Sequence, residues 1–204
     1  MGALMLFSTL AFVFVGHFTN NQQPETGTGP LFVGTWQGFS VYQTESPVGP
    51  FYALDLGGGY LNFRVNPFEA DQKVYVNDTG AIYQQLMTSS VVYLIFDQEE
   101  NDGVNQAVFE LTRFFRGKPF VLETGISAPY VPSEEEIAEG VNSSDVPYYD
   151  IANISAGDTG VYIKLGAPPA ITLFDNNLVM VTGHNANDTM LSVTKLGLIM
   201  YRLI

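Results

Sequence analysis

The chain has 204 residues, a formal net charge of −13 and no cysteine. Its 8 basic residues, against 21 acidic ones, exclude electrostatic binding to a nucleic-acid backbone or to an anionic lipid surface. The lack of cysteine excludes disulfides, thiolate nucleophiles and cysteine metal sites. Only 14% of the residues are charged, which favours an exported surface protein over a cytosolic enzyme.

The chain opens with an apolar stretch, residues 1–18, that contains no acidic or basic side chain. It lacks the basic residues that begin a secretory signal, and it is slightly short for a membrane-spanning helix. Its valines and phenylalanines suit a strand as well as a helix. We expect it to pack into a neighbouring subunit; packing within its own domain, a membrane anchor and a signal are the alternatives. The expected assembly residues are Leu4, Leu6, Phe7, Leu10, Phe12, Val13, Phe14 and Val15.

A polar segment, residues 19–30, follows the apolar stretch and contains Pro, Gly and small polar side chains. This composition is typical of a linker or extended arm. Fully extended, the segment reaches about 40 Å, far enough to carry residues 1–18 onto another molecule. The sequence therefore predicts an N-terminal segment, a linker and one body, residues 31–204.

The body consists of short apolar stretches separated by turn signals. Valine, isoleucine and aromatic residues dominate the stretches, and several alternate with period two, such as Val161, Ile163 and Leu165. This pattern predicts an all-β fold, a single antiparallel β-sandwich or jelly-roll-like domain, with a barrel as the related alternative. The expected strands cover 31–43, 51–56, 60–65, 73–77, 81–86, 90–96, 104–115, 118–124, 148–154, 161–165, 171–174, 178–183 and 189–204.

One helix is expected, within the long connection 126–147. Ser133 and Glu136 have the spacing of a capping box, and Gly140 supplies a stop signal. The acidic first turn also suits the helix dipole. We therefore predict one or two helical turns after Ser133.

Two short motifs resemble known families. Asp78-Thr79-Gly80 and Asp158-Thr159-Gly160 resemble the paired motif of aspartic proteases, but turn-forming residues precede both, which favours plain turns. Gly34-Thr35-Trp36 resembles the motif that opens lipocalins and avidin-like barrels. That resemblance implies a barrel that holds a small apolar ligand; the competing interpretation is a buried structural tryptophan.

The loop around residue 100 is acidic. Asp97, Glu99, Asn101 and Asp102 form a weak candidate calcium site that does not follow the EF-hand pattern; an ordinary acidic loop is the alternative. The two histidines, His17 and His184, are isolated in the sequence. Because no pair of groups is specified for acid–base or nucleophilic chemistry, we predict that the protein is not an enzyme and has no cofactor.

Four asparagines lie in Asn-x-Ser/Thr sequons, each in or near an expected turn or loop. They are candidate N-glycosylation sites if the chain is exported. The four are Asn77, Asn142, Asn153 and Asn187.

Together these features favour an extracellular structural subunit at the cell surface. We expect copies of the chain to form a pilus-like filament, because a head-to-tail contact through residues 1–18 propagates unless it closes into a ring. The layout is similar in organisation to filaments built by donor-strand exchange. The expected partners are copies of the chain and attached glycans, without nucleic acid, and any membrane contact runs through residues 1–18. A lipocalin-like binding barrel and a virion coat subunit are the alternatives.

Overall fold

The structure, a computed structural model, describes residues 29–47, 49–97, 102–140, 142–152, 154–175 and 177–204. Contacts divide these residues between two units. The main unit comprises Pro30–Pro129 and Pro147–Ile204, and the excursion Tyr130–Val146 belongs to the other. The main unit contains a four-stranded antiparallel sheet and a six-stranded, mostly parallel sheet together with helices. The prediction of an all-β sandwich, jelly roll or barrel is therefore wrong: the fold is mixed α/β.

The four-stranded sheet is an antiparallel meander in which strands follow one another in chain order. Alternate residues of β2 to β4, such as Val41, Leu54 and Leu61, are buried, while their neighbours lie on the outer face. One face of this sheet therefore covers the core and the other is open. Its strands are β1 (Leu31–Trp36), β2 (Phe39–Thr44), β3 (Phe51–Asp55) and β4 (Tyr60–Phe63).

The six-stranded sheet has the order β5-β9-β10-β8-β6-β7. β10, β8, β6 and β7 are parallel to one another, whereas β9 runs antiparallel to β10 and parallel to β5. Its strands are β5 (Tyr75–Val76), β6 (Val91–Phe96), β7 (Val121–Ile126), β8 (Thr159–Leu165), β9 (Ala170–Phe174) and β10 (Leu178–Gly183).

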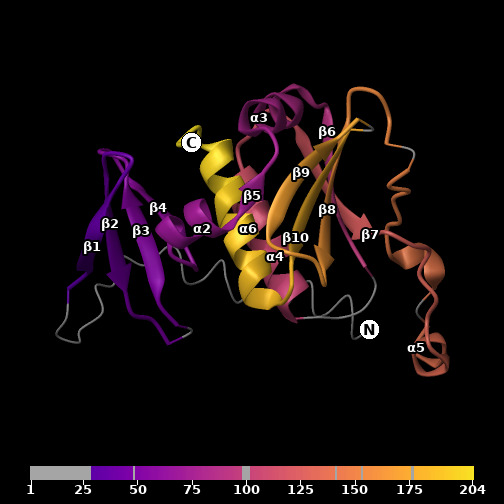
Figure 1. Ribbon diagram of the computed structural model, residues 1–204. Coiled ribbons are helices and arrows are strands. Elements are labelled where there is room, and N and C mark those ends of the chain that lie inside the picture. The colour runs from indigo at the N-terminus through magenta and orange to yellow at the C-terminus, as the bar shows by residue number, and fades with distance from the viewer. Residues whose placement is uncertain (1–28, 48, 98–101, 141, 153, 176) are drawn as a thin grey trace. The chain divides into compact units, whose positions relative to one another are not determined.

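Four helices accompany the sheets in the main unit: α2 (Pro67–Lys73), α3 (Thr79–Thr88), α4 (Asp102–Phe115) and α6 (Ala186–Met200). Figure 1 shows α6 between the four-stranded and the six-stranded sheet, where it contacts α2, α3, α4 and β10. Its residues from Thr189 to Met200 are all buried. The larger of two hydrophobic clusters runs from Phe63 of the first sheet through Leu196 of α6 to Val179 of the second.

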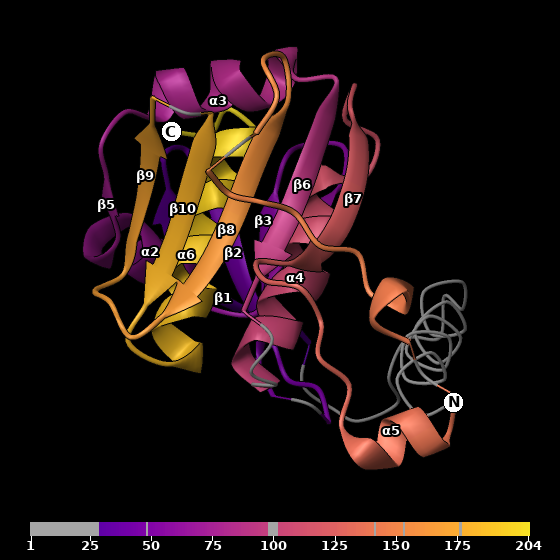
Figure 2. The same ribbon diagram turned by 90° about the vertical axis from the view of Figure 1, so that its right-hand side faces the viewer.

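In the described part of the main unit, no helix covers the opposite face of the six-stranded sheet. Instead, the segment that leads into β8 crosses this face (Figure 2), where Tyr149, Ile151 and Ile154 pack against Ile95 and neighbouring apolar residues. The sheet is thus covered by helices on one side and by an extended segment on part of the other. This double cover explains why five successive residues of β8, Thr159 to Ile163, are buried.

The stretches 81–86, 104–115 and 189–204, expected as strands, lie largely in helices α3, α4 and α6. In α3, Asp78 is the N-cap, and its carboxylate accepts a hydrogen bond from the Ala81 amide at 2.8 Å. The Asp78-Thr79-Gly80 motif therefore begins a helix and is not a turn between strands. In α6, Asn185 has the same capping role.

The excursion Tyr130–Val146 contains α5 (Glu134–Ala138) and the 3₁₀ turn Ser143–Asp145. Both hydrogen bonds of the expected capping box between Ser133 and Glu136 are present, so this prediction is confirmed. Hydrogen bonds from Tyr130 and Ser133 hold the pKa of the Glu136 carboxyl below its ordinary value.

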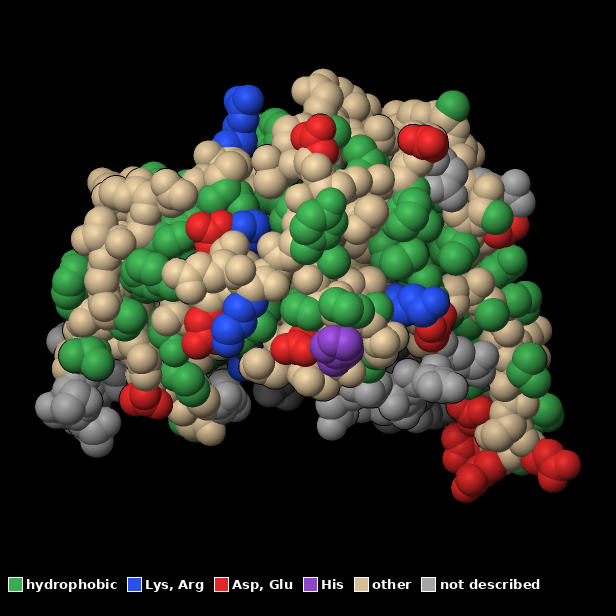
Figure 3. Space-filling view, in the orientation of Figure 1, with side chains coloured by type: hydrophobic (Ala, Val, Ile, Leu, Met, Phe, Trp, Pro, Cys, Tyr) green, Lys and Arg blue, Asp and Glu red, His purple; other side chains and the backbone are tan. Residues whose placement is uncertain are grey.

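Charged side chains are sparse on the face of the molecule in Figure 3, where apolar and uncharged polar groups cover most of the surface. None of the helices in the described ranges is both long enough and apolar enough to cross a membrane. The apolar N-terminal stretch lies outside those ranges.

Candidate functional site

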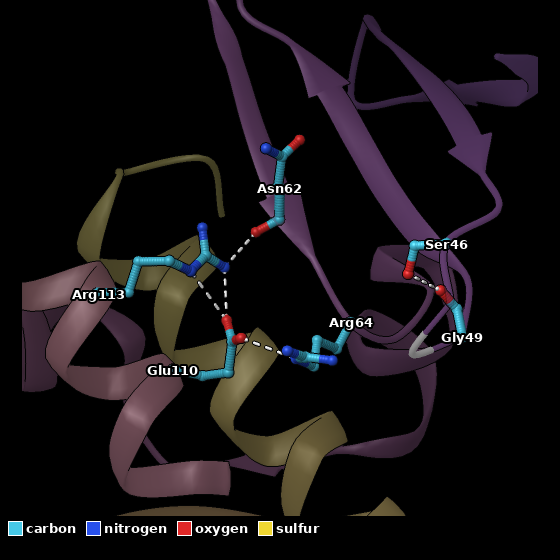
Figure 4. Close-up of polar contacts among 6 residues, drawn as sticks. All are labelled: Ser46, Gly49, Asn62, Arg64, Glu110 and Arg113. Carbon is cyan, nitrogen blue, oxygen red and sulfur yellow. Dashed lines mark hydrogen bonds and ion pairs between the residues drawn. The ribbon is translucent and has the colours of Figure 1, made fainter. Parts of the chain in front are cut away.

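A buried glutamate joins the four-stranded sheet to the helices. The carboxylate of Glu110, on α4, accepts from Arg64 Nε at 3.1 Å, and its second oxygen accepts from Arg113 Nε at 3.0 Å and Nη2 at 2.6 Å. Arg113 also donates to the backbone carbonyl of Asn62, on β4 (Figure 4). The residue Glu110 is 2% exposed, so two guanidinium groups satisfy one carboxylate that water hardly reaches.

Local structure places each member of this cluster. Glu110 and Arg113 are three residues apart on α4 and therefore share one face of that helix. Arg64 directly follows β4, and its guanidinium lies over the Phe51 ring, 4.8 Å from the ring centroid. The ring and the carboxylate together fix the orientation of the Arg64 side chain.

A groove of about 310 Å³ lies beside Arg64. Arg64 is the one charged residue among the described residues that line it. The other lining side chains are either apolar or neutral amides; they include Pro50, Val65, Gln106, Asn187 and Met190. The groove therefore combines one cation with an apolar wall and two amides, a composition suited to a small amphipathic ligand.

A second feature is the open side of the four-stranded sheet. Among the described strands β1 pairs only with β2, and its first three residues, Leu31, Phe32 and Val33, are exposed. On the outer face, the Phe32 ring contacts Tyr42 edge-on, and Tyr42 contacts the exposed Tyr60. An apolar edge strand beside an aromatic face is an unusual surface for an isolated domain.

Trp36, which carried the resemblance to lipocalins, is a structural residue. It lies at the end of β1, is 5% exposed, and donates to Asp71 of α2 at 3.2 Å. The Lys195 ammonium of α6 also binds Asp71. The tryptophan thus belongs to a polar contact that ties β1 to the helices, in an open sheet and not at the end of a barrel.

The candidate calcium site lies mostly outside the described residues. Glu99 and Asn101 fall there, and Asp102 begins α4. The Asp97 carboxylate follows β6 and accepts from Ser127 at 2.6 Å and from Tyr162 at 2.7 Å. In the part of the chain that the structure describes, no three His, Asp or Glu side chains converge as metal ligands, and the calcium site stays a prediction.

Two tyrosines lie where the extended segment crosses the sheet: Tyr162 of β8 is buried, and Tyr149 of the segment is half-buried. Burial, and then the hydrogen bond to Asp97, raises the pKa of Tyr162 to about 12. Burial, followed by the hydrogen bond to Glu123, does the same for Tyr149. Both phenols remain protonated at neutral pH and act as hydrogen-bond donors, not as bases.

The remaining predicted residues have varied positions. Asn142 and Asn187 are exposed, Asn153 lies outside the described residues, and Asn77 donates its side-chain amide to the Leu173 carbonyl at 3.0 Å. Asn77 is exposed as well, and the side-chain amide of Asn142 donates to the Gly140 carbonyl at 3.3 Å, so a glycan on Asn77 or Asn142 would have to replace a hydrogen bond. The assembly residues Leu4 to Val15 lie outside the described ranges.

The motifs that bear on catalysis are separated. Asp158 accepts a hydrogen bond from the Val91 amide at the start of β6, whereas Asp78 caps α3. His184 is exposed between β10 and α6. The two Asp-Thr-Gly motifs therefore have distinct structural roles.

The sequence analysis missed the Arg64–Glu110–Arg113 cluster. The one signal for it was the spacing of Glu110 and Arg113, which brings them together only on a helix.

A scan against protein-family models finds no match for the chain, and searches of curated proteins and of solved structures find no significant match either.

Proposed function

We propose that the protein is an extracellular structural subunit that assembles with copies of itself. In this proposal the apolar segment of one copy, residues 1–18, adds as a strand to β1 of the next copy. The observation that carries the proposal is the exposed apolar edge of β1, where Phe32 is 55% exposed. Edge strands of this kind pair readily with another chain.

Two further features support this joint. Natural proteins protect edges with charges, proline or bulges; β1 contains no charge and no proline, and the bulge between Phe32 and Gly34 is the one such device that it has. The aromatic outer face continues from the exposed side chains through Tyr42. Each large side chain that a donor segment buries contributes about 1.5–3 kcal/mol.

The position of the donor also fits the proposal. The polar linker, residues 19–30, leads directly into β1 at Leu31. Since each copy would have one donor segment and one acceptor edge, the contact would be head-to-tail and would extend into a filament unless it closed.

A pair of complementary variants tests this joint. A chain that lacks residues 1–20 keeps the acceptor edge and loses the donor, whereas Phe32→Lys keeps the donor and blocks the edge. We expect the intact chain to form filaments in electron micrographs, and each variant alone to be a folded monomer by light scattering. Mixed together, the two variants should stop at a one-to-one heterodimer.

Val121→Lys is the matched control, because Val121 lies at the start of β7, the last strand in the order of the described six-stranded sheet, and is 58% exposed. This variant should assemble as the intact chain does. A monomeric intact chain, or variants that do not pair when mixed, would overturn the proposal. A closed shell in the micrographs would replace the filament with a coat.

A further inference from the structure

We propose that the groove beside Arg64 binds a small organic monocarboxylate. The proposal is independent of self-assembly, because the groove is lined by Arg64 together with residues of α4 and α6, whereas the proposed joint lies at the opposite edge strand of the four-stranded sheet, β1.

The cluster contains two guanidinium groups and one carboxylate. Arg113 alone makes two contacts with one oxygen of Glu110, through Nε and Nη2. One guanidinium neutralises one carboxylate, so Arg64 adds a positive charge that Glu110 does not need. This excess cation is notable in a chain with 8 basic and 21 acidic residues.

Arg64 has hydrogen-bond donors that its contacts with the described residues do not use. Its contacts with described residues use Nε, toward Glu110, and the flat face of the guanidinium, over Phe51. No described residue accepts a hydrogen bond from its two terminal nitrogens. These two coplanar donors match the two oxygens of a carboxylate.

Recess and orientation make these donors effective. The Arg64 side chain is 16% exposed, so the guanidinium has already lost most of its contact with water before a ligand binds. Because the Glu110 contact and the Phe51 ring already fix the guanidinium, binding costs little side-chain entropy.

The volume and the lining of the groove determine which ligand body fits beside the carboxylate. Its volume of about 310 Å³ lies at the lower end of small-molecule sites. Val65, Pro50 and Met190 provide apolar contacts. Gln106 and Asn187 provide neutral hydrogen-bonding groups. With one cation at the wall, the groove matches a monoanion with a short apolar body better than a dianion such as phosphate.

Hexanoate and its neutral isostere hexanamide are the probes. The readout is the amide chemical shifts of the full-length Phe32→Lys chain, which we expect to be a monomer whether or not the intact chain assembles. We expect hexanoate to shift the side-chain amide signals of Gln106 and Asn187 in a saturable way. Hexanamide should bind at least about tenfold more weakly, because it has no charge with which to make the charge-assisted pair of hydrogen bonds. Inorganic phosphate can make such a pair, but it should also bind more weakly, because it leaves the apolar side chains of the groove without a contact.

Three variants make the test specific. Arg64→Gln should weaken hexanoate binding at least about tenfold, a loss appropriate to a charge-assisted hydrogen bond. Gln106→Trp keeps Arg64 and fills the groove, so it should also weaken binding. Lys73→Gln removes an equal charge from an exposed surface pair and should have no effect. Equal binding of acid and amide, unchanged binding by Arg64→Gln, or no shifts at Gln106 and Asn187 would overturn the proposal.

Discussion

The two sheets of this protein are covered in different ways. The four-stranded sheet has one face on the core and leaves its aromatic outer face and the edge of β1 exposed. The six-stranded sheet has helices on one face and an extended segment across part of the other. The difference bears on both proposals: the proposed joint uses the exposed edge of β1, and the proposed ligand groove lies where Arg64, next to β4, meets α4 and α6.

The contact between α4 and β4 should have the largest effect on stability. Glu110→Gln leaves Arg64 and Arg113 without their buried carboxylate, and we expect the free energy of unfolding to fall by about 3 kcal/mol. Urea denaturation measures this change. Glu69→Gln is the control, because it breaks the exposed pair with Lys73 and should cost about 0.5 kcal/mol or less. Equal effects of the two changes would show that Glu110 does not tie α4 to the first sheet.

Packing around α6 should come next. A Cβ added at Gly197 would lie 2.8 Å from the Phe114 ring of α4, so Gly197→Ala should overpack the helix layer and cost about 2 kcal/mol. In the four-stranded sheet, a Cβ at Gly58 meets no atom within 4 Å, and Gly58→Ala should be nearly neutral in thermal denaturation. A neutral Gly197→Ala would contradict the close packing of α6 on α4.

A smaller effect is expected at the start of α3. Asp78→Ala removes the N-cap hydrogen bond to the Ala81 amide and should lower the free energy of unfolding by about 1 kcal/mol. Ser133→Ala removes the cap of α5, which belongs to the other unit, and should leave the unfolding of the main unit unchanged. A shift of the main transition by Ser133→Ala would mean that the two units unfold together.

The last effect depends on pH and concerns the face crossed by the extended segment. The pKa of Tyr162 is about 12 in the folded chain, compared with about 10 for an unfolded tyrosine. Between these values the unfolded chain loses the proton first, so stability falls as pH rises from about 10 to 12. Below pH 10 this contribution is fully present.

Tyr162→Phe should therefore reduce the slope of stability against pH in urea titrations at pH 9, 10 and 11. Tyr75→Phe, at an exposed tyrosine of β5, should retain the full slope. If Tyr162→Phe retained it as well, the phenol would not be buried against Asp97 in solution.

The same difference between the sheets explains which strands could be predicted. Residues 51–56 and 60–65 contain β3 and β4, and 90–96 and 178–183 contain β6 and β10. Short apolar stretches between turn signals identify a strand in either kind of sheet. They do not reveal its direction, so a mostly parallel sheet was predicted as antiparallel.

The helices were missed for identifiable reasons. α6 is buried on all sides, and a helix without a polar face has no apolar stripe to detect. In α4 the buried residues Ala107, Leu111 and Phe114 have helical spacing, but Ala107, Phe109 and Leu111 also alternate. Glu110 lies on the buried side of α4, where it pairs with two arginines. A charged residue on that side obscures the apolar stripe by which a helix is recognised in a sequence.

The groove was beyond sequence analysis because its parts are distant in the chain. Arg64 and Glu110 are 46 residues apart, and Met190 comes from the last helix. Only the mixed α/β fold brings β4, α4 and α6 together. The exposed edge was partly predictable, because the apolar character of Leu31 to Val33 is visible in the sequence. Their exposure was not, because it depends on β1 being an edge strand.

Hydrogen–deuterium exchange of the intact chain at increasing protein concentration tests the proposed joint most directly. We expect the amides of β1, Leu31–Trp36, to become protected as the concentration rises, while those of β7, Val121–Ile126, do not change. Removal of residues 1–20 should abolish this added protection. Exchange of β1 that is fast at every concentration, or equally slow with and without residues 1–20, would contradict the account.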